Sequence, residues 1–291
     1  MSDTEPPASL EAAPAPVAVE RQETCSLATV RRVAAMLDLD PDACTAAGTL
    51  PRGWQFTLMG ADTPRSSLRD DGFPGLGVSV PDLGLPRLML GGRSVDYLQD
   101  IPLGARLQRR SQVLEMRHKS TEQGPMAVLT IAHTLSLPAH AGTALVETQT
   151  YLLMPARRPS SPPTRATPTK AAAPQPRALH RREVHADATM LFQYSALGFN
   201  SHKIHLDRRH AQEVEGFEDL VVNGGLTTLL MTEFLRQELG VQPKSLKARH
   251  LAPLYCDRRI TLTAEDEGTR WHLCAYDDRH TLALDMEVVA Q

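Results

Sequence analysis

Residues 220–240 read LVVNGGLTTLLMTEFLRQELG, which is the most apolar helical pattern in the chain. The residues that share one stripe at helical spacing are Leu226, Leu229, Leu230, Phe234 and Leu235. Gly240 follows as a C-cap. A helix that is apolar almost all round needs cover on most sides, and a curved sheet wrapped around it provides that cover. The stretch is interrupted by Thr232 and Glu233 and is too short to span a membrane.

Strand-like segments on both sides of this helix follow one another without intervening helices. The segments rich in β-branched or alternating apolar residues are 91–99, 107–119, 126–137 and 145–154 in the first half, and 245–255, 258–267, 269–278 and 281–290 in the second. A shorter amphipathic helix is predicted near 25–40. This order disfavours a doubly wound parallel sheet and predicts an α+β fold with antiparallel strands.

Proline divides the chain, which contains 22 prolines and only 18 glycines in 291 residues. One group of prolines lies in residues 1–24, predicted to be a disordered tail, and another in 155–178, predicted to be a Pro/Ala-rich linker. The remaining segments, 25–154 and 179–291, are predicted to be two folded halves. The Gly/Pro/Asp-rich stretch from Gly48 to Pro86 is long for a loop and is expected to cover a surface.

Composition excludes several classes of protein. The net charge of −3 disfavours a nucleic-acid binder held by bulk charge. No glycine-rich phosphate-binding loop is present, and no apolar run suggests a membrane protein. The four cysteines form no C-x-x-C pair, and with no export signal in the sequence they predict a cytoplasmic location.

The densest set of candidate functional residues follows Phe199. It consists of Asn200, His202, His205 and Asp207. Two histidines three positions apart on a helix could hold a metal, but Lys203 between them would repel a cation, so no metal site is predicted. A histidine is also a suitable base near neutral pH, and an asparagine amide can orient a water molecule.

The start of the apolar helix offers a second set of candidates, Asn223, Gly224 and Gly225. Glycines at a helix start leave backbone N–H groups approachable, and these donors suit a carbonyl oxygen that gains negative charge. The alternative is that the glycines only permit close packing against a sheet. A base, a water-orienting amide and oxyanion donors together describe the addition of water to a conjugated thioester, or its reverse.

These residues resemble a known family. The segments FQYSALGFNSHKIHLD at 192–207 and EGFEDLVVNGGL at 215–226 are similar to the MaoC-type, or type 2, enoyl-thioester hydratases. More narrowly, they resemble the bacterial double-hotdog branch that contains mesaconyl-CoA and itaconyl-CoA hydratases. Segments 50–74 and 85–126 resemble the N-terminal half of that branch, so the resemblance runs from about Thr24 to the end, apart from the linker.

The resemblance implies a double hotdog fold, in which each half is a long helix wrapped by an antiparallel sheet. It implies an acyl-CoA thioester substrate and no cofactor or metal. His205 matches the family's catalytic histidine, and Asn200 occupies the position of its catalytic aspartate. An amide cannot act as a general base, so His205 would carry more of the proton transfer or another acid would assist it.

The remaining positions are expected to bind substrate. Gly224, with Gly225 adjacent, matches the family's oxyanion contact. His202 stands where the broader motif has asparagine, and Asn223 stands where the branch commonly has histidine. The 25–154 half has no equivalent of the I-H-x-D motif, so it is expected to be non-catalytic and to form part of the pocket.

The function predicted from these observations is a hydro-lyase that hydrates an enoyl-CoA or dehydrates a β-hydroxyacyl-CoA. A short dicarboxylic substrate such as mesaconyl-CoA or itaconyl-CoA fits the resemblance, with arginines such as Arg249 as candidate carboxylate partners. The alternatives are a hotdog acyl-CoA thioesterase and a non-catalytic acyl-thioester-binding protein, because one fold hosts several functions. A homodimer is compatible with all three, and no nucleic-acid or membrane partner is expected.

Overall fold

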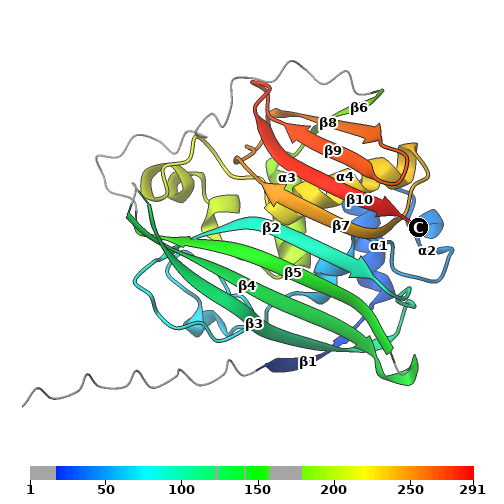
Figure 1. Ribbon diagram of the computed structural model, residues 1–291, viewed down its shortest axis with the longest axis horizontal. Helices are drawn as coiled ribbons and strands as arrows, with labels where there is room; N and C mark the ends of the chain where they lie inside the picture. The colour runs from blue at the N-terminus through cyan, green and yellow to red at the C-terminus, as the bar shows by residue number, and fades with distance from the viewer. Residues whose placement is uncertain (1–17, 122–123, 141, 157–178) are drawn as a thin grey trace, which may run out of the picture.

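A single curved antiparallel sheet dominates the computed structural model, which describes residues 18–121, 124–140, 142–156 and 179–291 (Figure 1). Its ten strands run in the order β1-β3-β4-β5-β2-β7-β10-β9-β8-β6. Their bounds are β1 Val19–Thr24, β2 Arg87–Tyr97, β3 Arg106–Thr121, β4 Gly124–Leu137, β5 Gly142–Met154, β6 His180–His185, β7 Pro243–His250, β8 Arg259–Asp266, β9 Trp271–Tyr276 and β10 Leu282–Ala290. Each half of the chain supplies five neighbouring strands, and the halves join where β2 pairs with β7.

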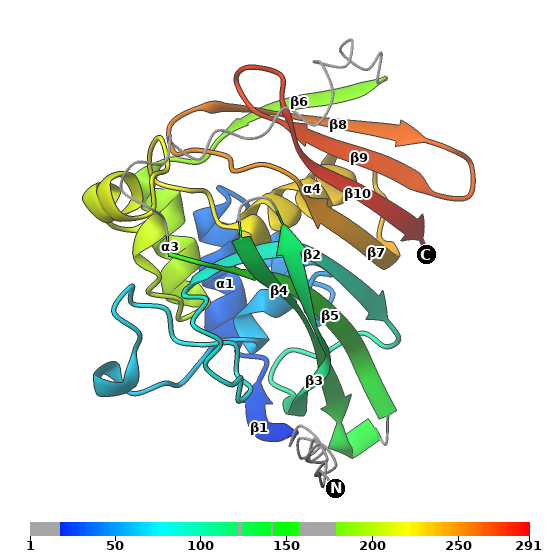
Figure 2. The same ribbon diagram turned by 60° about the vertical axis from the view of Figure 1, so that its left-hand side comes forward.

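The helices lie together on the concave side of this sheet (Figure 2). They are α1 Leu27–Met36, α2 Pro41–Thr45, α3 Ala188–Leu197 and α4 Gly224–Glu238, with short turns η1 Gln55–Leu58, η2 Arg65–Ser67, η3 Pro138–His140, η4 Lys203–His205 and η5 His210–Val214. All residues of α4 from Leu226 to Leu235 are buried, as the apolar pattern predicted. No helix in the described ranges is long and apolar enough to cross a membrane.

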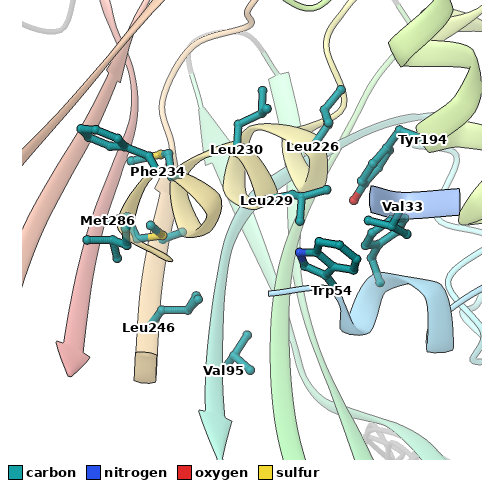
Figure 3. Packing of buried hydrophobic residues seen from close by; sticks show 14 of the residues in the cluster. Val33, Trp54, Val95, Tyr194, Leu226, Leu229, Leu230, Phe234, Leu246 and Met286 are labelled. Atoms are coloured by element: carbon teal, nitrogen blue, oxygen red, sulfur yellow. The ribbon is translucent and has the colours of Figure 1, made fainter. Parts of the chain in front are cut away.

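One hydrophobic core joins the two halves. Val33 of α1 and Val95 of β2 share it with Leu229 of α4 and Met286 of β10 (Figure 3). The helix of the N-terminal half, α1, has 10 residues, whereas α4 has 15. The helix in the first half is therefore shorter than the long helix implied by the resemblance, and α4 fills much of the shared concave space.

A buried hydrogen bond ties the N-terminal half to α4. The Trp54 indole Nε1 donates to Glu233 Oε1 at 2.7 Å, and Arg236 also pairs with this carboxylate at 2.6 Å. Gly53 has φ +103°, and a Cβ there would lie 2.3 Å from the Thr232 hydroxyl oxygen. Glycine at 53 therefore allows the turn before Trp54 to approach α4 closely.

The N-terminal edge differs from the sequence prediction. Residues 1–24 were expected to form a disordered tail, but Val19–Thr24 forms strand β1, so the expectation was wrong for these six residues. They pair with β3, and Arg21 and Glu23 form ion pairs with Asp62 and Arg109. These partners are distant in sequence, which is why local composition did not reveal the strand. Residues 1–17 and most of the expected linker lie outside the described residues.

The long stretch from Gly48 to Pro86 does cover a surface. Its apolar residues Leu76, Val78, Val80, Leu83 and Leu85 pack on an apolar cluster formed by β4 and β5. The same stretch also contacts the segment that carries Asn200 and His205, through hydrogen bonds from Ser201 and Lys203 to backbone carbonyl groups of residues 70–72.

Candidate active site

The turn that carries Asn200 is shaped by the end of α3. Gly198 caps the helix, and Phe199 adopts a left-handed conformation with φ +49°, which a non-glycine residue rarely adopts. The chain therefore reverses sharply, and the Asn200 backbone N–H donates to Ser195 O at 2.8 Å. Asn200 Oδ1 accepts a hydrogen bond from the backbone N–H of His202 at 3.1 Å. The amide oxygen is thus used to order the turn, which leaves Asn200 Nδ2 as the donor end of the side chain.

His205 is buried at the end of η4, and one contact fixes its tautomer. Its Nδ1 lies 2.7 Å from the carbonyl oxygen of Val221. A carbonyl can only accept, so Nδ1 carries the proton and Nε2 presents a lone pair. Burial lowers the pKa of His205 to about 4, although the bond to Val221 acts in the opposite direction. The ring is therefore neutral at pH 7 and can accept a proton at Nε2.

His202 lies beside His205, with ring centroids 5.7 Å apart in an edge-to-face arrangement. Its Nε2 is 3.5 Å from Asp71 Oδ2, and its ring contacts Phe73. Burial and the neighbouring His205 lower the pKa of His202 to about 3, while Asp71 raises it. His202 therefore joins the candidate base to the N-terminal half.

The covering stretch of the N-terminal half is held firmly on this segment. Lys203 donates through its backbone N–H to Asp71 O at 2.8 Å and through Nζ to Asp70 O at 2.6 Å. The Ser201 hydroxyl donates to Gly72 O at 2.6 Å. A cleft of about 990 Å³ adjoins these contacts, with Asp71, Phe73, Leu88, His210 and Glu215 among the residues that line it. Both halves therefore build the candidate site.

The start of α4 lies next to His205, because the carbonyl bonded to the imidazole belongs to Val221, three residues before Gly224. The N–H groups of Gly224, Gly225 and Leu226 begin the helix and have no intrahelical acceptor. Asn223 is the N-cap but makes no capping bond with its side chain. Its Nδ2 donates to the Ser195 hydroxyl at 3.4 Å, and its Oδ1 is buried without a hydrogen-bond partner.

Both glycines of α4 lie against other side chains. A Cβ at Gly224 would lie 3.0 Å from His250 Cε1, and a Cβ at Gly225 would lie 2.2 Å from Tyr194 Oη. The same Cβ at Gly225 would lie 3.5 Å from Arg93 Nη2. Close packing, which the sequence left open as an alternative role for these glycines, is therefore real, and it coexists with approachable N–H groups.

The structure thus places all six sequence-predicted residues around one region. Asn200 and His202 share the turn after α3, His205 is bonded to the segment before α4, and Asn223, Gly224 and Gly225 begin α4. The sequence missed Arg93, Tyr194 and His250, which lie against the same helix start. No local pattern marked them, since each becomes a neighbour of α4 only through strand pairing and helix packing.

Comparison with known proteins supports a common origin for this arrangement. Residues 53–256 match the family described as hydroxyacyl-thioester dehydratase type 2. The chain is 30% identical over 267 residues to the mesaconyl-C(4)-CoA hydratase of Chloroflexus aurantiacus, covering 92% of this chain and 93% of that protein. It is 32% identical over 99 residues to the mitochondrial hydroxyacyl-thioester dehydratase type 2 of Schizosaccharomyces pombe, covering 33% of this chain and 31% of that protein.

Solved structures confirm the fold. A MaoC-like dehydratase from Phytophthora capsici superposes with a TM-score of 0.70 at 15% identity, over 95% of each chain. A Mycobacterium tuberculosis protein described as having a double hotdog fold gives a TM-score of 0.57 at 15% identity, over 95% of this chain and 96% of that one. The expected α+β double hotdog fold is therefore confirmed.

Proposed function

Because the chain belongs to the hydroxyacyl-thioester dehydratase type 2 family and is an acyl-CoA hydro-lyase, we propose that it hydrates a short carboxylated enoyl-CoA with His205 as the residue that transfers the proton. The observation that carries this assignment is the hydrogen bond from His205 Nδ1 to Val221 O. It supports Nε2 as the basic atom, because Nδ1 carries the proton, and it ties the imidazole to the segment that leads into α4.

In the hydration direction, a water O–H proton passes to His205 Nε2 while the water oxygen bonds to Cβ of the enoyl group. The electron pair of the double bond moves toward the thioester carbonyl, whose oxygen gains negative charge. The N–H groups of Gly224 and Gly225 stabilise this charge, assisted by the helix dipole of α4. Delivery of the proton to Cα completes the addition of H and OH and returns the protein to its starting state.

Asn200 would position the water. Its Oδ1 is held by the backbone N–H of His202, so the side chain is oriented and Nδ2 is the group left to donate. An amide cannot take the proton itself, so His205 would carry more of the proton transfer or another acid would assist it. His202 and Asn223 would bind substrate, and the cleft beside Asp71 would admit the acyl-CoA.

The carboxylated substrate class is supported by the mesaconyl-C(4)-CoA hydratase, which matches nearly the whole chain. We also propose a cytoplasmic location, since the four cysteines are buried and free, and a homodimer, which size-exclusion chromatography with light scattering of the full chain would test. The assignment of residues 25–154 as a non-catalytic, pocket-forming half joined by a linker to 179–291 is part of the same proposal.

The test is a hydratase assay that follows the loss of enoyl absorbance with crotonyl-CoA and with C5-dicarboxylic enoyl-CoAs. His205→Ala should lose nearly all activity, while His118→Ala, which alters an exposed histidine of β3, should behave as wild type. Near-wild-type rates for His205→Ala would refute the role of His205. Release of free thiol without loss of the double bond would indicate a thioesterase, and tight binding without turnover would indicate a binding protein.

A further inference from the structure

Arg93 of β2 is a buried cation that is only partly neutralised. Its side chain is 10% exposed, and its Nε lies 3.4 Å from Glu147 Oε1. Within the described part of the chain, neither terminal amino group of Arg93 donates a hydrogen bond. Buried guanidinium groups normally have their donors satisfied, because an unpaired buried charge is costly. The terminal amino groups of Arg93 are therefore available to donate to a ligand.

Glu147 pairs with Arg93 and is itself oriented by two glutamine side chains. The Gln149 side chain donates to Glu147 Oε1 at 2.6 Å, and the Gln55 side chain donates to Glu147 Oε2 at 3.0 Å. Gln55 is in turn bonded to the Tyr97 hydroxyl at 3.2 Å. Glu147 therefore lies beside Nε of the guanidinium, and the two terminal amino groups are the donors left for another partner.

The outer end of Arg93 points to the start of α4. A Cβ added at Gly225, in the first turn of α4, would lie 3.5 Å from Arg93 Nη2. Tyr194 reaches the same place, since its Oη would lie 2.2 Å from that Cβ, and its hydroxyl has no hydrogen-bond partner among the described residues. The terminal amino groups of Arg93 and the hydroxyl of Tyr194 therefore lie beside the α4 N–H groups that are proposed to bind the thioester oxygen, and both can donate to a ligand there.

His250 adds a third group to this place. Arg93 pairs with Ala248 across the β2–β7 junction, so His250 projects from the same concave face one pleat further along β7. Its Nε2 is buried without a partner, and its ring lies against Gly224. Three side chains from three elements thus leave polar atoms unsatisfied around the first turn of α4.

We propose that Arg93 binds a carboxylate on the acyl group of the substrate, with Tyr194 and His250 lining the same subsite. This inference rests on the proposed hydratase function. A guanidinium presents two parallel N–H donors that match the two oxygens of a carboxylate, and a pre-oriented fork makes the pairing stronger. In an enoyl-CoA that carries its carboxylate on Cβ, only the double bond separates the carboxylate from the thioester carbonyl. One substrate can therefore reach Arg93 and the N–H groups of α4 together.

Arg249, the carboxylate partner considered from the sequence, does not fit this role. Its side chain is 63% exposed and forms an ion pair with Asp285 at 2.7 Å. It pairs with Gly92 across the junction, so it lies on the convex face, whereas Arg93 faces the concave side. Arg249 is therefore a matched control for Arg93. It lies next to the residue that pairs with Arg93, but its side chain is outside the proposed site.

The test uses two enoyl-CoAs that differ only in the group on Cβ, fumaryl-CoA with a carboxylate and crotonyl-CoA with a methyl group. We expect the wild-type chain to favour fumaryl-CoA by at least ~100-fold in kcat/KM. Arg93→Gln should remove this preference by lowering kcat/KM for fumaryl-CoA far more than for crotonyl-CoA, because the methyl group of crotonyl-CoA makes no ion pair. Arg249→Gln should retain the preference.

Arg93→Gln leaves Glu147 as an unpaired buried charge and risks misfolding. The double variant Arg93→Gln/Glu147→Gln removes both charges, and it should fold, hydrate crotonyl-CoA and show no preference for fumaryl-CoA. A folded double variant that keeps the preference would overturn the inference. Equal loss on both substrates would also overturn it and would assign Arg93 to the thioester oxygen instead.

A binding measurement separates this inference from the hydratase proposal. By calorimetry, wild type should bind succinyl-CoA at least ~30-fold more tightly than butyryl-CoA, and the double variant should bind them equally. A wild-type chain that hydrates crotonyl-CoA but shows no carboxylate preference in either assay refutes the role of Arg93 and leaves the hydratase intact. A chain that hydrates neither substrate yet shows the Arg93-dependent binding preference refutes the hydratase alone.

Discussion

Replacing Gly225 by alanine tests how tightly the first turn of α4 is packed. Alanine in a helix is favoured over glycine by up to ~1 kcal/mol, so an open site would gain stability. At Gly225, however, the new Cβ would lie 2.2 Å from Tyr194 Oη, well inside contact distance. Tyr194 is 7% exposed and stacks on Phe56 at 4.4 Å between ring centroids, so it cannot swing away freely. Overpacking of this kind costs ~1–3 kcal/mol, so Gly225→Ala should destabilise the protein.

Tyr194→Phe should relieve this clash. Once the hydroxyl oxygen is removed, the nearest ring atom is Cζ, at 3.2 Å from the added Cβ, which a small shift accommodates. The Tyr194 hydroxyl has no hydrogen-bond partner among the described residues, so Tyr194→Phe alone should cost less than ~1 kcal/mol. In that background Gly225→Ala should become neutral or stabilising, which corresponds to a coupling of ~1–3 kcal/mol between the two positions.

Urea denaturation of the wild type, both single variants and the double variant measures this coupling. Gly224→Ala is the matched control, because its Cβ would contact His250 and Leu90 rather than Tyr194. Its effect should be the same with tyrosine or phenylalanine at 194. If the cost of Gly225→Ala were equal in both backgrounds within ~0.5 kcal/mol, the contact between Gly225 and Tyr194 would be refuted.

Three further predictions follow from buried polar groups. Trp54→Phe removes the 2.7 Å hydrogen bond to Glu233 and should lower the free energy of unfolding by ~1.5–3 kcal/mol in urea denaturation, at the lower end because Arg236 still pairs with the carboxylate. The pKa of His205 lies at about 4, below the usual 6.5, so kcat/KM should fall only as the pH drops toward 4; an acid limb centred near 6.5 would contradict this. Burial and Arg93 lower the pKa of His250 to about 3 in the folded chain. Below about pH 6.5 the imidazole is therefore protonated in the unfolded chain but remains neutral in the folded chain. The stability due to neutral His250 is thus present above pH 6.5 and lost toward pH 3, and His250→Leu should reduce the slope of unfolding free energy against pH by up to ~1.4 kcal/mol per pH unit between these limits.

The candidate site illustrates which features a sequence can reveal. His205 and Asn200 lie five positions apart in one short segment, so residue types and spacing were enough to select them as candidates. The glycines that begin α4 were visible in the same way. The effect of Asn200 on its own turn, through the backbone N–H of His202, became evident only from the structure.

Elements whose signals are local could be predicted from the amino-acid sequence. The apolar residues of α4 predicted a buried helix, and runs of β-branched residues predicted the antiparallel strands, because burial imposes a periodicity that each segment carries within itself. The two-half organisation followed from the positions of the prolines and from the resemblance.

The burial of particular polar residues depends on strand pairing and helix packing, which the sequence pattern does not show. Arg93, Glu147 and His250 come from β2, β5 and β7, and their meeting depends on the register of three strands. Strand β1 likewise depends on pairing with β3, about 90 residues later in the chain. The sequence positions of charged residues have no periodicity that distinguishes a solvated side chain from a buried one. The carboxylate subsite proposed at Arg93 could therefore be inferred only from the sheet, which brings Arg93 against α4.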